Sequence, residues 1–419
     1  MIRIGILGCG RILNAHLQGF LRLRHQGVDD FRITALVARR EADAWMFHTR
    51  GQGPPPRPPV LPPASGDPLA ASHTYVSDLH TDVEVRIYTD YRRMIDAGGV
   101  DAVLDTTPVF LHHQAGLTAL TAGLHLLTQK PLAVTVRAAR AMVETARRNR
   151  LSLGTFENAR YRPWTRAVRW AFDTGLLGRP QLALLGSLGG LWSPNRIVAE
   201  TPWRHDKRLA GGGAAIDIGV HQLDILRYIF GEIRTVQALV RTFEPERVWA
   251  DEQGNVSQRC PVNVEDTYLA SVTFDHDAIA QLLWSWAGHG QPLEIPGAPA
   301  VFGSAGCVQA GHLILDDGSR EPLLERFERD LDEERRARFF PVGLRDPFAV
   351  LQWQWLQEIR SGGQHLETNG EEGLRDLAAA YAILEAATLG RAVSLEEVLS
   401  GAVDIHQRDL DQQYGFLAE

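Results

Sequence analysis

The sequence predicts an α/β protein of two domains, for three reasons. With 419 residues, the chain is longer than one hydrophobic core usually serves. Strand-like and helix-like segments alternate as far as about residue 155, a pattern typical of a parallel sheet with right-handed crossovers. Beyond that point strand-like runs follow one another without long helices between them, which indicates a large, mostly antiparallel open sheet. We therefore expect an α/β domain at residues 1–155 and an α+β domain at residues 156–419.

The first domain begins with a buried-type strand at 4–7, followed by an amphipathic helix at 13–24 and a second strand at 32–37. Residues 50–72 are rich in proline, which lacks the N–H that a strand ladder requires, so they predict an inserted loop of unknown role. Regular alternation resumes with a helix at 91–97, a strand at 102–106, a helix near 114–122 and a strand at 125–127.

The second domain carries a different pattern. Helices are predicted at 164–173, 217–230, 346–362 and 371–389, and Gly231 ends the second of them. Strands are predicted at 181–188, 235–242, 266–274, 278–286, 307–309 and 312–315. This succession of strands is what predicts an antiparallel sheet.

Composition narrows the class of partner. The formal net charge is −8 and the isoelectric point is near 6.0, whereas nucleic acids and acidic membranes attract clustered Lys and Arg. Cys9, Cys260 and Cys307 are far apart and odd in number, which favours reduced thiols in the cytoplasm and gives no zinc pattern. No stretch of about 20 uncharged apolar residues occurs, and the N-terminus opens directly into a strand. We expect a cytoplasmic protein without a metal, which binds a small molecule and neither nucleic acid nor a membrane.

The first strand breaks into a glycine pattern that is typical of dinucleotide binding. Gly8 and Gly10 suit a turn at which the backbone approaches a pyrophosphate, and Arg11 and Ile12 open the helix that follows. The third glycine of the fingerprint falls on Leu13, and glycines at a strand end are also ordinary turn residues. Because the pattern follows a strand, precedes a helix and begins a βαβ unit, it predicts a Rossmann dinucleotide-binding domain.

The end of the second strand bears on the choice of nucleotide. An acidic residue there binds the adenosine ribose of NAD, but this chain has Ala38 followed by Arg39 and Arg40. A guanidinium pairs with phosphate through two parallel hydrogen bonds, which suits the 2′-phosphate of NADP. We therefore favour NADP, with NAD as the alternative if the two arginines merely begin a solvated helix.

A second group of polar residues lies in the other domain. Asp217 and His221 are four residues apart and follow three consecutive glycines at 211–213. On an α-helix this spacing stacks a carboxylate and an imidazole on one face, about 6 Å apart, so that both can act on one bound molecule. A surface ion pair is the competing interpretation. A cofactor domain and an acid/base pair in one chain predict a dehydrogenase.

Four motifs together carry a family resemblance. They are the opening Ile-Gly-Ile-Leu-Gly-Cys-Gly-Arg-Ile at 4–12, Thr107-Pro108 followed by His112, the tripeptide Gln129-Lys130-Pro131, and the glycine run with Asp217 and His221. This set resembles the Gfo/Idh/MocA family, which includes glucose-fructose oxidoreductase and inositol 2-dehydrogenase. The resemblance implies a Rossmann domain, a C-terminal domain whose open sheet builds homodimers or homotetramers, and oxidation or reduction of a sugar or cyclitol carbon with NAD or NADP. The family's Glu-Lys-Pro signature has glutamine at position 129 here, which removes a carboxylate near the cofactor.

Hydride transfer requires removal of the alcohol proton as the hydride leaves carbon, so the site needs a base and a donor at the reacting oxygen. With the resemblance we assign the base to His221, and the positive charge or a share in the proton relay to Lys130. Asp217 is expected to orient the imidazole or to bind a substrate hydroxyl. The residues expected at the cofactor are Gly8, Gly10, Arg11, Ile12, Ala38, Arg39, Arg40, Thr107, Pro108, His112, Gln129 and Lys130.

Four further residues are expected to bind substrate. Arg160 and Tyr161 lie where the chain leaves the first domain, while Trp203 and Arg204 offer a stacking face and a donor to a sugar ring. Core packing is the alternative for the aromatic residues, and His112 equally suits a place over the nicotinamide or the start of a helix. Glu265 is expected to be structural.

These residues favour an NAD(P)-dependent oxidoreductase, with NADP preferred, that acts on a sugar, sugar acid or cyclitol. An NAD-dependent glycosidase that oxidises the sugar ring transiently is the first alternative. A non-catalytic dinucleotide-binding regulator is the second, but it predicts loss of the lysine and the histidine, and this chain has both.

Overall fold

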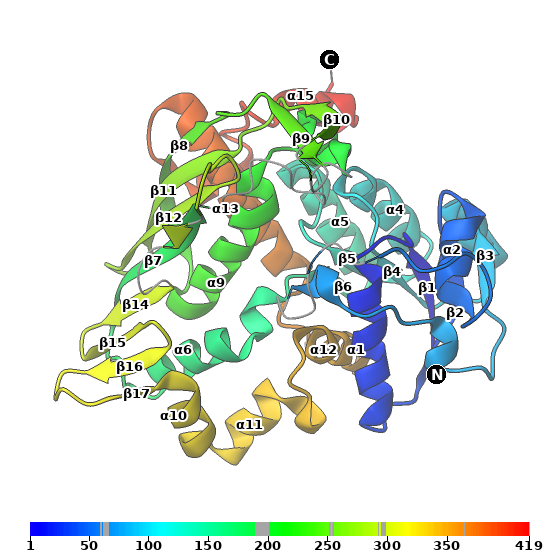
Figure 1. The fold of residues 1–419 in the computed structure, drawn as a ribbon, viewed down its shortest axis with the longest axis horizontal. Coiled ribbons are helices and arrows are strands. Elements are labelled where there is room, and N and C mark those ends of the chain that lie inside the picture. Colours follow the sequence, from blue (N-terminus) through cyan, green and yellow to red (C-terminus); the bar gives the residue numbers. More distant parts are fainter. Residues whose placement is uncertain are drawn as a thin grey trace. The chain divides into compact units, whose positions relative to one another are not determined.

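The computed structural model describes residues 1–418 except 59, 60, 62–66, 189–200, 251, 252, 254, 292, 295–298 and 364. The chain forms two compact units (Figure 1). The first consists of Met1–Ala133, Ala139–Tyr161 and Arg336–Gly373, and the second of Val134–Ala138, Arg162–Arg335 and Leu374–Glu419. These units differ from the predicted domains mainly because a late segment of the chain packs with the first unit.

In the described part of the first unit, six parallel strands form a sheet in the order β3-β2-β1-β4-β5-β6. The order reverses between β1 and β4, and at such a switch point the carboxyl ends of the strands open a ligand crevice. The predicted parallel α/β sheet is therefore confirmed. The strands are β1 (Ile2–Leu7), β2 (Phe31–Val37), β3 (Arg86–Tyr88), β4 (Ala102–Asp105), β5 (His125–Gln129) and β6 (Leu153–Phe156).

The helices of the first unit include two that the sequence pattern missed or shortened. Helix α2 (Glu41–His48) was not predicted, and α4 (Val109–Thr121) begins five residues before the expected start at 114. The others are α1 (Leu13–His25), α3 (Tyr91–Ala97) and α12 (Pro347–Ser361), with 3₁₀ turns at Pro68–Ala70, Val76–Asp78, Ala159–Tyr161 and Pro341–Gly343. Helices α5 (Val136–Asn149), α11 (Glu333–Phe339) and α13 (Gly370–Leu389) each contain residues of both units.

Helix α12 belongs to the first unit because it packs closely on α1. A Cβ atom at Gly19 of α1 would lie 3.0 Å from the Cβ of Phe348 and would overlap the side chain of Gln352. The amide of Gln352 also donates a hydrogen bond to the backbone carbonyl of His16 at 3.0 Å. A glycine therefore brings the two helices together, across more than 300 residues of sequence.

The described residues of the second unit form a ten-stranded sheet in the order β17-β16-β15-β14-β7-β12-β11-β8-β18, with β13 also paired to β7. Strands β7 and β12 run parallel, and the other pairs are antiparallel. This confirms the large, mostly antiparallel sheet. The strands are β7 (Pro180–Leu188), β8 (Ile233–Arg241), β11 (Thr267–Phe274), β12 (Ile279–Ser285), β13 (Leu293–Glu294), β14 (Ala300–Gly303), β15 (Gly306–Gln309), β16 (His312–Leu315), β17 (Arg320–Pro322) and β18 (Val393–Ser394), while β9 (Glu246–Ala250) and β10 (Val256–Pro261) pair with each other.

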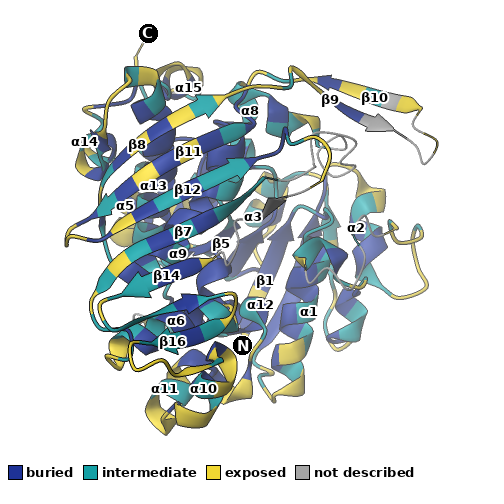
Figure 2. Ribbon diagram, turned by 60° about the vertical axis from the view of Figure 1, so that its left-hand side comes forward, coloured by how far each residue is buried: buried dark blue, intermediate teal, exposed yellow. Residues whose placement is uncertain are grey.

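Alternation along β11 separates the two faces of this sheet. Tyr268, Ala270 and Val272 are buried, whereas Leu269 between them is exposed. Figure 2 shows α9 and α13 behind the sheet and exposed positions on the side toward the viewer. The remaining helices of this unit are α6 (Pro163–Asp173), α8 (Lys207–Ala210), α9 (Val220–Phe230), α10 (Leu323–Asp330), α14 (Leu395–Ser400) and α15 (Arg408–Gln413), with a 3₁₀ turn at Pro202–His205 and a π-helical turn at Ala215–Gly219.

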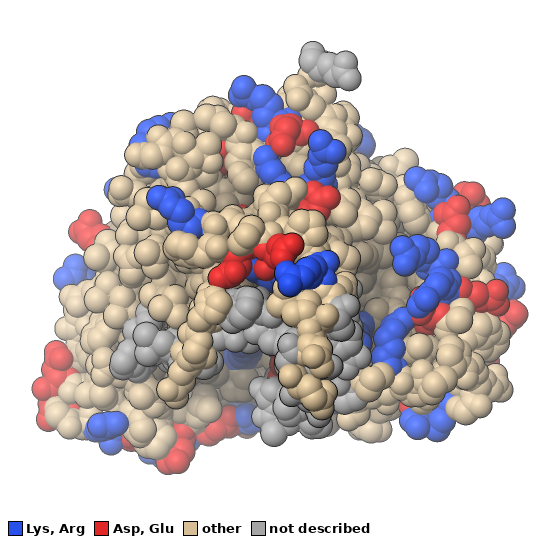
Figure 3. Space-filling view, turned by 45° about the horizontal axis from the view of Figure 1, so that its top comes forward, with Lys and Arg blue, Asp and Glu red and all other residues tan. Residues whose placement is uncertain are grey.

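The surface and the helices bear on the class of partner. Within the described ranges, no helix combines the length and the apolar character needed to cross a membrane. On the face drawn in Figure 3, Lys and Arg side chains lie among Asp and Glu side chains. On this face, positive and negative side chains are thus interspersed.

Candidate active site

The loop after β1 has the geometry of a phosphate cradle. Gly8 has a φ of +90°, and a Cβ atom there would lie 2.8 Å from the backbone carbon and oxygen of Thr106. A Cβ atom at Gly10, by contrast, would have no heavy atom within 4 Å, so this side of the loop is open. The N-terminus of α1 follows without a side-chain cap, and the positive end of a helix dipole favours an anion. The loop therefore fits the pyrophosphate of a dinucleotide, and the residue at the third glycine position, Leu13, is fully buried in the core.

The end of β2 has no acidic side chain. Ala38 is buried there, and Arg39 and Arg40 are exposed directly before α2. Arg40 forms two hydrogen bonds of 2.9 and 2.8 Å with the carboxylate of Asp43, and this contact is the largest cause of a lowered pKa for Asp43. The two arginines thus precede a helix, as the solvated-helix interpretation expects, and their contact with a 2′-phosphate stays a prediction.

Asp43 has a second arginine partner that sequence analysis missed. Arg57, from the proline-rich insertion, pairs with Asp43 and also donates a hydrogen bond of 3.0 Å to the carbonyl of Cys9. Residues 59, 60 and 62–66 of the predicted insertion lie outside the described residues. Burial raises the pKa of the Cys9 thiol to about 12, so this cysteine beside the phosphate cradle is an unreactive thiol at neutral pH.

His112 lies inside the first unit rather than on its surface. Its Nδ1 is 2.8 Å from the carbonyl oxygen of Pro131, and its Nε2 is 2.8 Å from that of Thr107. The ring thus connects the loop after β4, which contains Thr107 and Pro108, with the loop after β5, which contains Lys130. Only 1% of His112 is exposed. Its burial and its two hydrogen bonds favour a role in positioning the two loops over direct contact with the nicotinamide.

Gln129 also faces the interior. Its amide nitrogen lies 2.6 Å from the Nε2 of His16 on α1, and burial lowers the pKa of His16 to about 3. His16 is therefore neutral, and its Nε2 accepts the hydrogen bond from the Gln129 amide. Its ring packs edge-on against Phe156 and Phe348. Lys130 follows directly at the carboxyl end of β5, joined to Pro131 by a cis peptide bond, and is partly exposed.

In the second unit, tight packing explains the three glycines. Gly211 has a φ of +82°, and a Cβ atom there would overlap the hydroxyl of Tyr381. At Gly213 a Cβ atom would overlap the carbonyl of Glu265, and at Gly212 it would lie 2.6 Å from Ile216. Sequence analysis found the run but not its reason, because the contacts at Gly211 and Gly213 come from residues more than 50 positions away.

Glu265 holds the start of the segment that carries Asp217 and His221. One of its carboxylate oxygens accepts hydrogen bonds from the backbone N–H groups of Gly213 at 2.8 Å and Ala215 at 2.9 Å. Burial is the main cause of a pKa raised to about 7. From a position just before β11, Glu265 therefore caps the start of this segment as a structural residue.

The segment from Ala215 to Gly219 is a π-helical turn, so the expected continuous α-helix over 217–230 is wrong at its start. A π turn has wider spacing than an α turn, so the stacking of Asp217 and His221 that a regular α-helix would give no longer follows from their spacing, and their joint action stays a prediction. Such turns are common at functional sites, where they rotate side chains out of the regular helical pattern. His221 lies in the first turn of α9 and is partly exposed.

Three of the predicted residues meet in the second unit. Arg204 forms an ion pair of 2.7 Å with Asp217, and its guanidinium lies 4.6 Å from the centre of the Trp203 ring. Asp217 thus has an arginine partner that sequence spacing did not suggest. Lys130 belongs to the first unit, so its convergence with Asp217 and His221 is a proposal taken up below.

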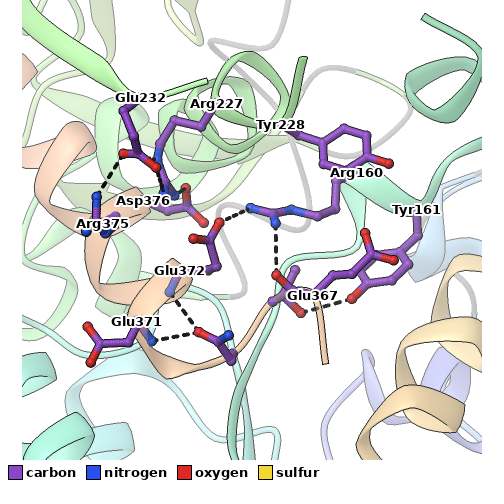
Figure 4. A network of polar contacts seen from close by, with 12 residues as sticks. Arg160, Tyr161, Arg227, Tyr228, Glu232, Glu367, Glu371, Glu372, Arg375 and Asp376 are labelled. Carbon is purple, nitrogen blue, oxygen red and sulfur yellow. Dashed lines mark hydrogen bonds and ion pairs between the residues drawn. The ribbon is translucent and has the colours of Figure 1, made fainter. Parts of the chain in front are cut away.

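Arg160 and Tyr161 have partners inside the first unit (Figure 4). Arg160 donates to the carbonyl of Glu367 at 2.9 Å and pairs with Glu372 at 3.0 Å, while the Tyr161 hydroxyl donates to Gln354 at 2.8 Å. Their exposed fractions are only 4% and 1%. This burial favours a role in anchoring the segment between α12 and α13, and their predicted contact with substrate stays a prediction. Among the described residues, no cluster of three or more His, Cys, Asp or Glu side chains is placed to hold a metal ion.

The chain resembles known proteins along most of its length. Residues 68–155 match the oxidoreductase family model of the NAD-binding Rossmann fold, and residues 165–309 match the GFO/IDH/MocA C-terminal domain. Levoglucosan dehydrogenase of Pseudarthrobacter phenanthrenivorans is 28% identical over 275 residues, which cover 63% of this chain and 68% of that protein. For 1,5-anhydro-D-fructose reductase of Ensifer adhaerens the identity is 28% over 309 residues, covering 74% and 84%.

The same fold occurs in solved structures. Levoglucosan dehydrogenase in complex with NADH and levoglucosan superposes with a TM-score of 0.67 at 19% identity, over 94% of this chain and 99% of that one. An oxidoreductase from Agrobacterium radiobacter in complex with NAD⁺, L-tartaric acid and magnesium gives a TM-score of 0.68 at 19% identity, over 94% and 98%. With both domain models matched and the phosphate cradle in place, the chain belongs to the Gfo/Idh/MocA family of oxidoreductases, which has an NAD-binding Rossmann fold.

Proposed function

We propose that the protein transfers a hydride between a nicotinamide dinucleotide, with NADP favoured, and a ring or chain carbon of a sugar, sugar acid or cyclitol. One observation carries this proposal. The open cradle at Gly10, the loop at Thr107 and the ammonium of Lys130 follow β1, β4 and β5, so all lie at the carboxyl edge of one parallel sheet. That edge is where a Rossmann fold binds its dinucleotide. Lys130, the proton-transferring group at this edge, would therefore lie beside the bound dinucleotide.

The identity of the residue at position 130 supports a role in proton transfer. Of the 43 Lys and Arg residues in this chain, only Lys130 and Lys207 are lysines. An arginine supplies the same positive charge but does not give up its proton, whereas an ammonium can do both. In a chain that uses arginine almost everywhere, a lysine at this position favours a relay over simple charge pairing.

The nicotinamide, when bound, accepts or supplies the hydride. His221 takes the proton of the alcohol that is oxidised, and Lys130 donates a hydrogen bond to the same oxygen, which steadies the alkoxide as it forms. Asp217, paired with Arg204, presents a carboxylate and a guanidinium to neighbouring hydroxyls, and Trp203 beside them offers an apolar ring face. Together these groups suit a ring that carries several hydroxyls.

The names of the relatives support the substrate class. Levoglucosan dehydrogenase, 1,5-anhydro-D-fructose reductase and the myo-inositol 2-dehydrogenase of Thermotoga maritima all act on sugars, sugar derivatives or a cyclitol, and the last is 25% identical over 319 residues. Ala38, with Arg39 and Arg40 beyond it, supports NADP over NAD, because no carboxylate at the end of β2 meets the adenosine ribose.

A substrate screen tests this function. Sugars, sugar acids, cyclitols and glycosides are incubated with NAD or NADP, while the absorbance of the reduced nicotinamide and the cleavage of glycosidic bonds are followed together. We expect reduction of the cofactor with at least one free sugar or cyclitol, faster with NADP. Release of sugar from a glycoside without net reduction would indicate the redox-assisted glycosidase instead. Binding of the nucleotide without either reaction across the panel would favour the non-catalytic regulator.

We also propose a homodimer or homotetramer assembled through the large sheet. Leu239 on β8 and Leu269 on β11 are direct neighbours in register, and their exposed fractions are 60% and 44%. Ile279 on β12 is 52% exposed. Adjacent exposed apolar side chains on a sheet face are typical of a surface that a second subunit covers.

A further inference from the structure

The proline-rich insertion contacts the phosphate cradle directly. Arg57 donates a hydrogen bond of 3.0 Å to the carbonyl of Cys9, the residue between Gly8 and Gly10. The next residue, Pro58, accepts a hydrogen bond of 2.7 Å from the guanidinium of Arg11, on the other side of Gly10. Two consecutive residues of the insertion thus bracket the loop that approaches the cofactor, although the insertion is far from it in sequence.

Charge gathers at the same place. Asp43, in the first turn of α2, receives both Arg40 and Arg57, and Arg39 is exposed one residue before Arg40. Three guanidinium groups therefore accompany two carboxylates in this part of the first unit, since Glu41 also lies in the first turn of α2. Because Ala38 supplies no acid, the three arginines outnumber the two carboxylates by one, and this positive balance suits an anionic group on the adenosine ribose.

Open volume adjoins Arg57. A cavity of about 290 Å³ lies against it, bounded by Arg11 and Asn14 at the start of α1, by Phe47 of α2 and by His73 beyond the insertion. Among the described residues the Oδ1 atom of Asn14 has no hydrogen-bond partner, although it is buried. The side chain of Arg57, 28% exposed, thus borders open volume in addition to its partners Asp43 and Cys9.

We infer that Arg57 binds the 2′-phosphate on the adenosine ribose of NADP, which makes the proline-rich insertion a determinant of nucleotide choice. This inference rests on the proposed preference for NADP. On binding, the guanidinium of Arg57 exchanges the carboxylate of Asp43 for the phosphate, while Asp43 keeps its two hydrogen bonds from Arg40. The exchange replaces one ion pair with another, so no charge is left unpaired in the partly buried site.

The test compares two small probes that differ only in the 2′-phosphate. Binding of 2′,5′-ADP and of 5′-AMP is measured by calorimetry for the full-length protein, for Arg57→Ala and for the control Arg50→Ala. Arg50 is a matched control, because it is an exposed arginine at the start of the same insertion, paired with Asp78 and absent from the cavity wall. Thermal unfolding of each variant checks that it folds.

We expect Arg57→Ala to weaken 2′,5′-ADP by about 10-fold or more, since a hydrogen-bonded charge pair is lost, and 5′-AMP by less than about 3-fold. Arg50→Ala is expected to change neither. Asp43→Asn is expected to tighten 2′,5′-ADP, because it removes the carboxylate that competes for Arg57.

Several results would overturn the inference. Equal weakening of both probes by Arg57→Ala would mean that the arginine only braces the loop or binds the pyrophosphate, and no weakening would remove it from the site. If the unmodified protein binds 5′-AMP and NAD but discriminates against 2′,5′-ADP, the inference falls while the oxidoreductase function stands. If it binds none of these nucleotides, the proposed function falls as well.

Discussion

At the scale of single residues, the proposal gives Lys130 and His221 separate parts in one proton transfer. Lys130→Ala and His221→Ala are each expected to lower kcat by about 10²- to 10⁴-fold, the usual contribution of a positioned acid or base, while the Kd for the nucleotide changes little. Steady-state kinetics and nucleotide titrations measure both quantities. Lys207→Ala is the matched control, because Lys207 is the other lysine of the chain and pairs with Asp409. A normal kcat in either variant would discard the role of that residue.

Gln129 illustrates how a departure from a family motif is accommodated. Its amide donates to a neutral, buried His16, a contact that a residue without polar atoms cannot replace. We expect Gln129→Leu to lower the free energy of unfolding by about 1–3 kcal/mol, since it leaves a buried imidazole nitrogen without its partner. Gln129→Glu is expected to cost less, because a carboxylate accepts a hydrogen bond from the other tautomer of His16. Urea unfolding measures both, and a Gln129→Leu variant as stable as the parent would refute the contact.

The residues that sequence analysis missed share one property. Their partners lie far along the chain or in an irregular loop, so no local sequence spacing predicts the contacts. This holds for the pair of Asp43 with Arg57 and for the hydrogen bond from Gly213 to Glu265. The glycines at 8 and 10, by contrast, stand directly after a strand and before a helix, and that local context was sufficient.

At the scale of elements, the segment from Gly211 to His221 depends on Glu265. Burial raises the pKa of this carboxyl group from 4.5 to about 7, so the folded state favours its protonated form. Its contribution to stability is complete below pH 4.5 and is lost as the pH rises to about 7, by about 3 kcal/mol in all. A glutamine keeps the accepting oxygen for the N–H groups of Gly213 and Ala215 but does not ionise.

Glu265→Gln therefore tests this link. The free energy of unfolding of the variant, relative to the parent, is expected to rise between pH 4.5 and 7 and to be level above pH 8. Denaturant unfolding of both proteins, at steps of half a pH unit, measures this difference in free energy. Groups that titrate in the same way in both proteins do not contribute to it. A difference that does not change with pH would show that folding does not raise the pKa of Glu265.

Elements with a strong local pattern were predicted well, and those set by packing were not. The helix at 91–97 and the strand at 312–315 have the predicted bounds, because their patterns and flanking turns are clear. The π turn at Ala215–Gly219 departs from the predicted α-helix, since glycine packing against Glu265 decides its geometry. Helix α12 was found as a helix, but its place with the first unit depends on the close contact at Gly19.

At the scale of the whole molecule, the exposed face of the large sheet leads to a prediction about assembly. Leu269→Asp places a charge among apolar neighbours on that face, so the oligomer is expected to dissociate to monomers. Light scattering coupled to size-exclusion chromatography measures the mass. The control is Leu324→Asp on α10, because Leu324 is exposed to the same extent, 44%, but lies outside the sheet. An oligomer that survives Leu269→Asp alone, or a parent protein that is a monomer, would contradict the proposed interface.

In the proposed reaction, groups from the two units act on one substrate. Lys130 stands at the edge of the Rossmann sheet and His221 at the start of α9, and each unit holds its own group by packing within itself. A crystal structure of the ternary complex with the reduced nucleotide and a sugar found in the substrate screen tests this most directly. We predict the Nζ of Lys130 and a ring nitrogen of His221 within about 3.2 Å of the same substrate oxygen, on the carbon that faces the nicotinamide. A sugar bound with either group turned away from that oxygen would contradict the claim.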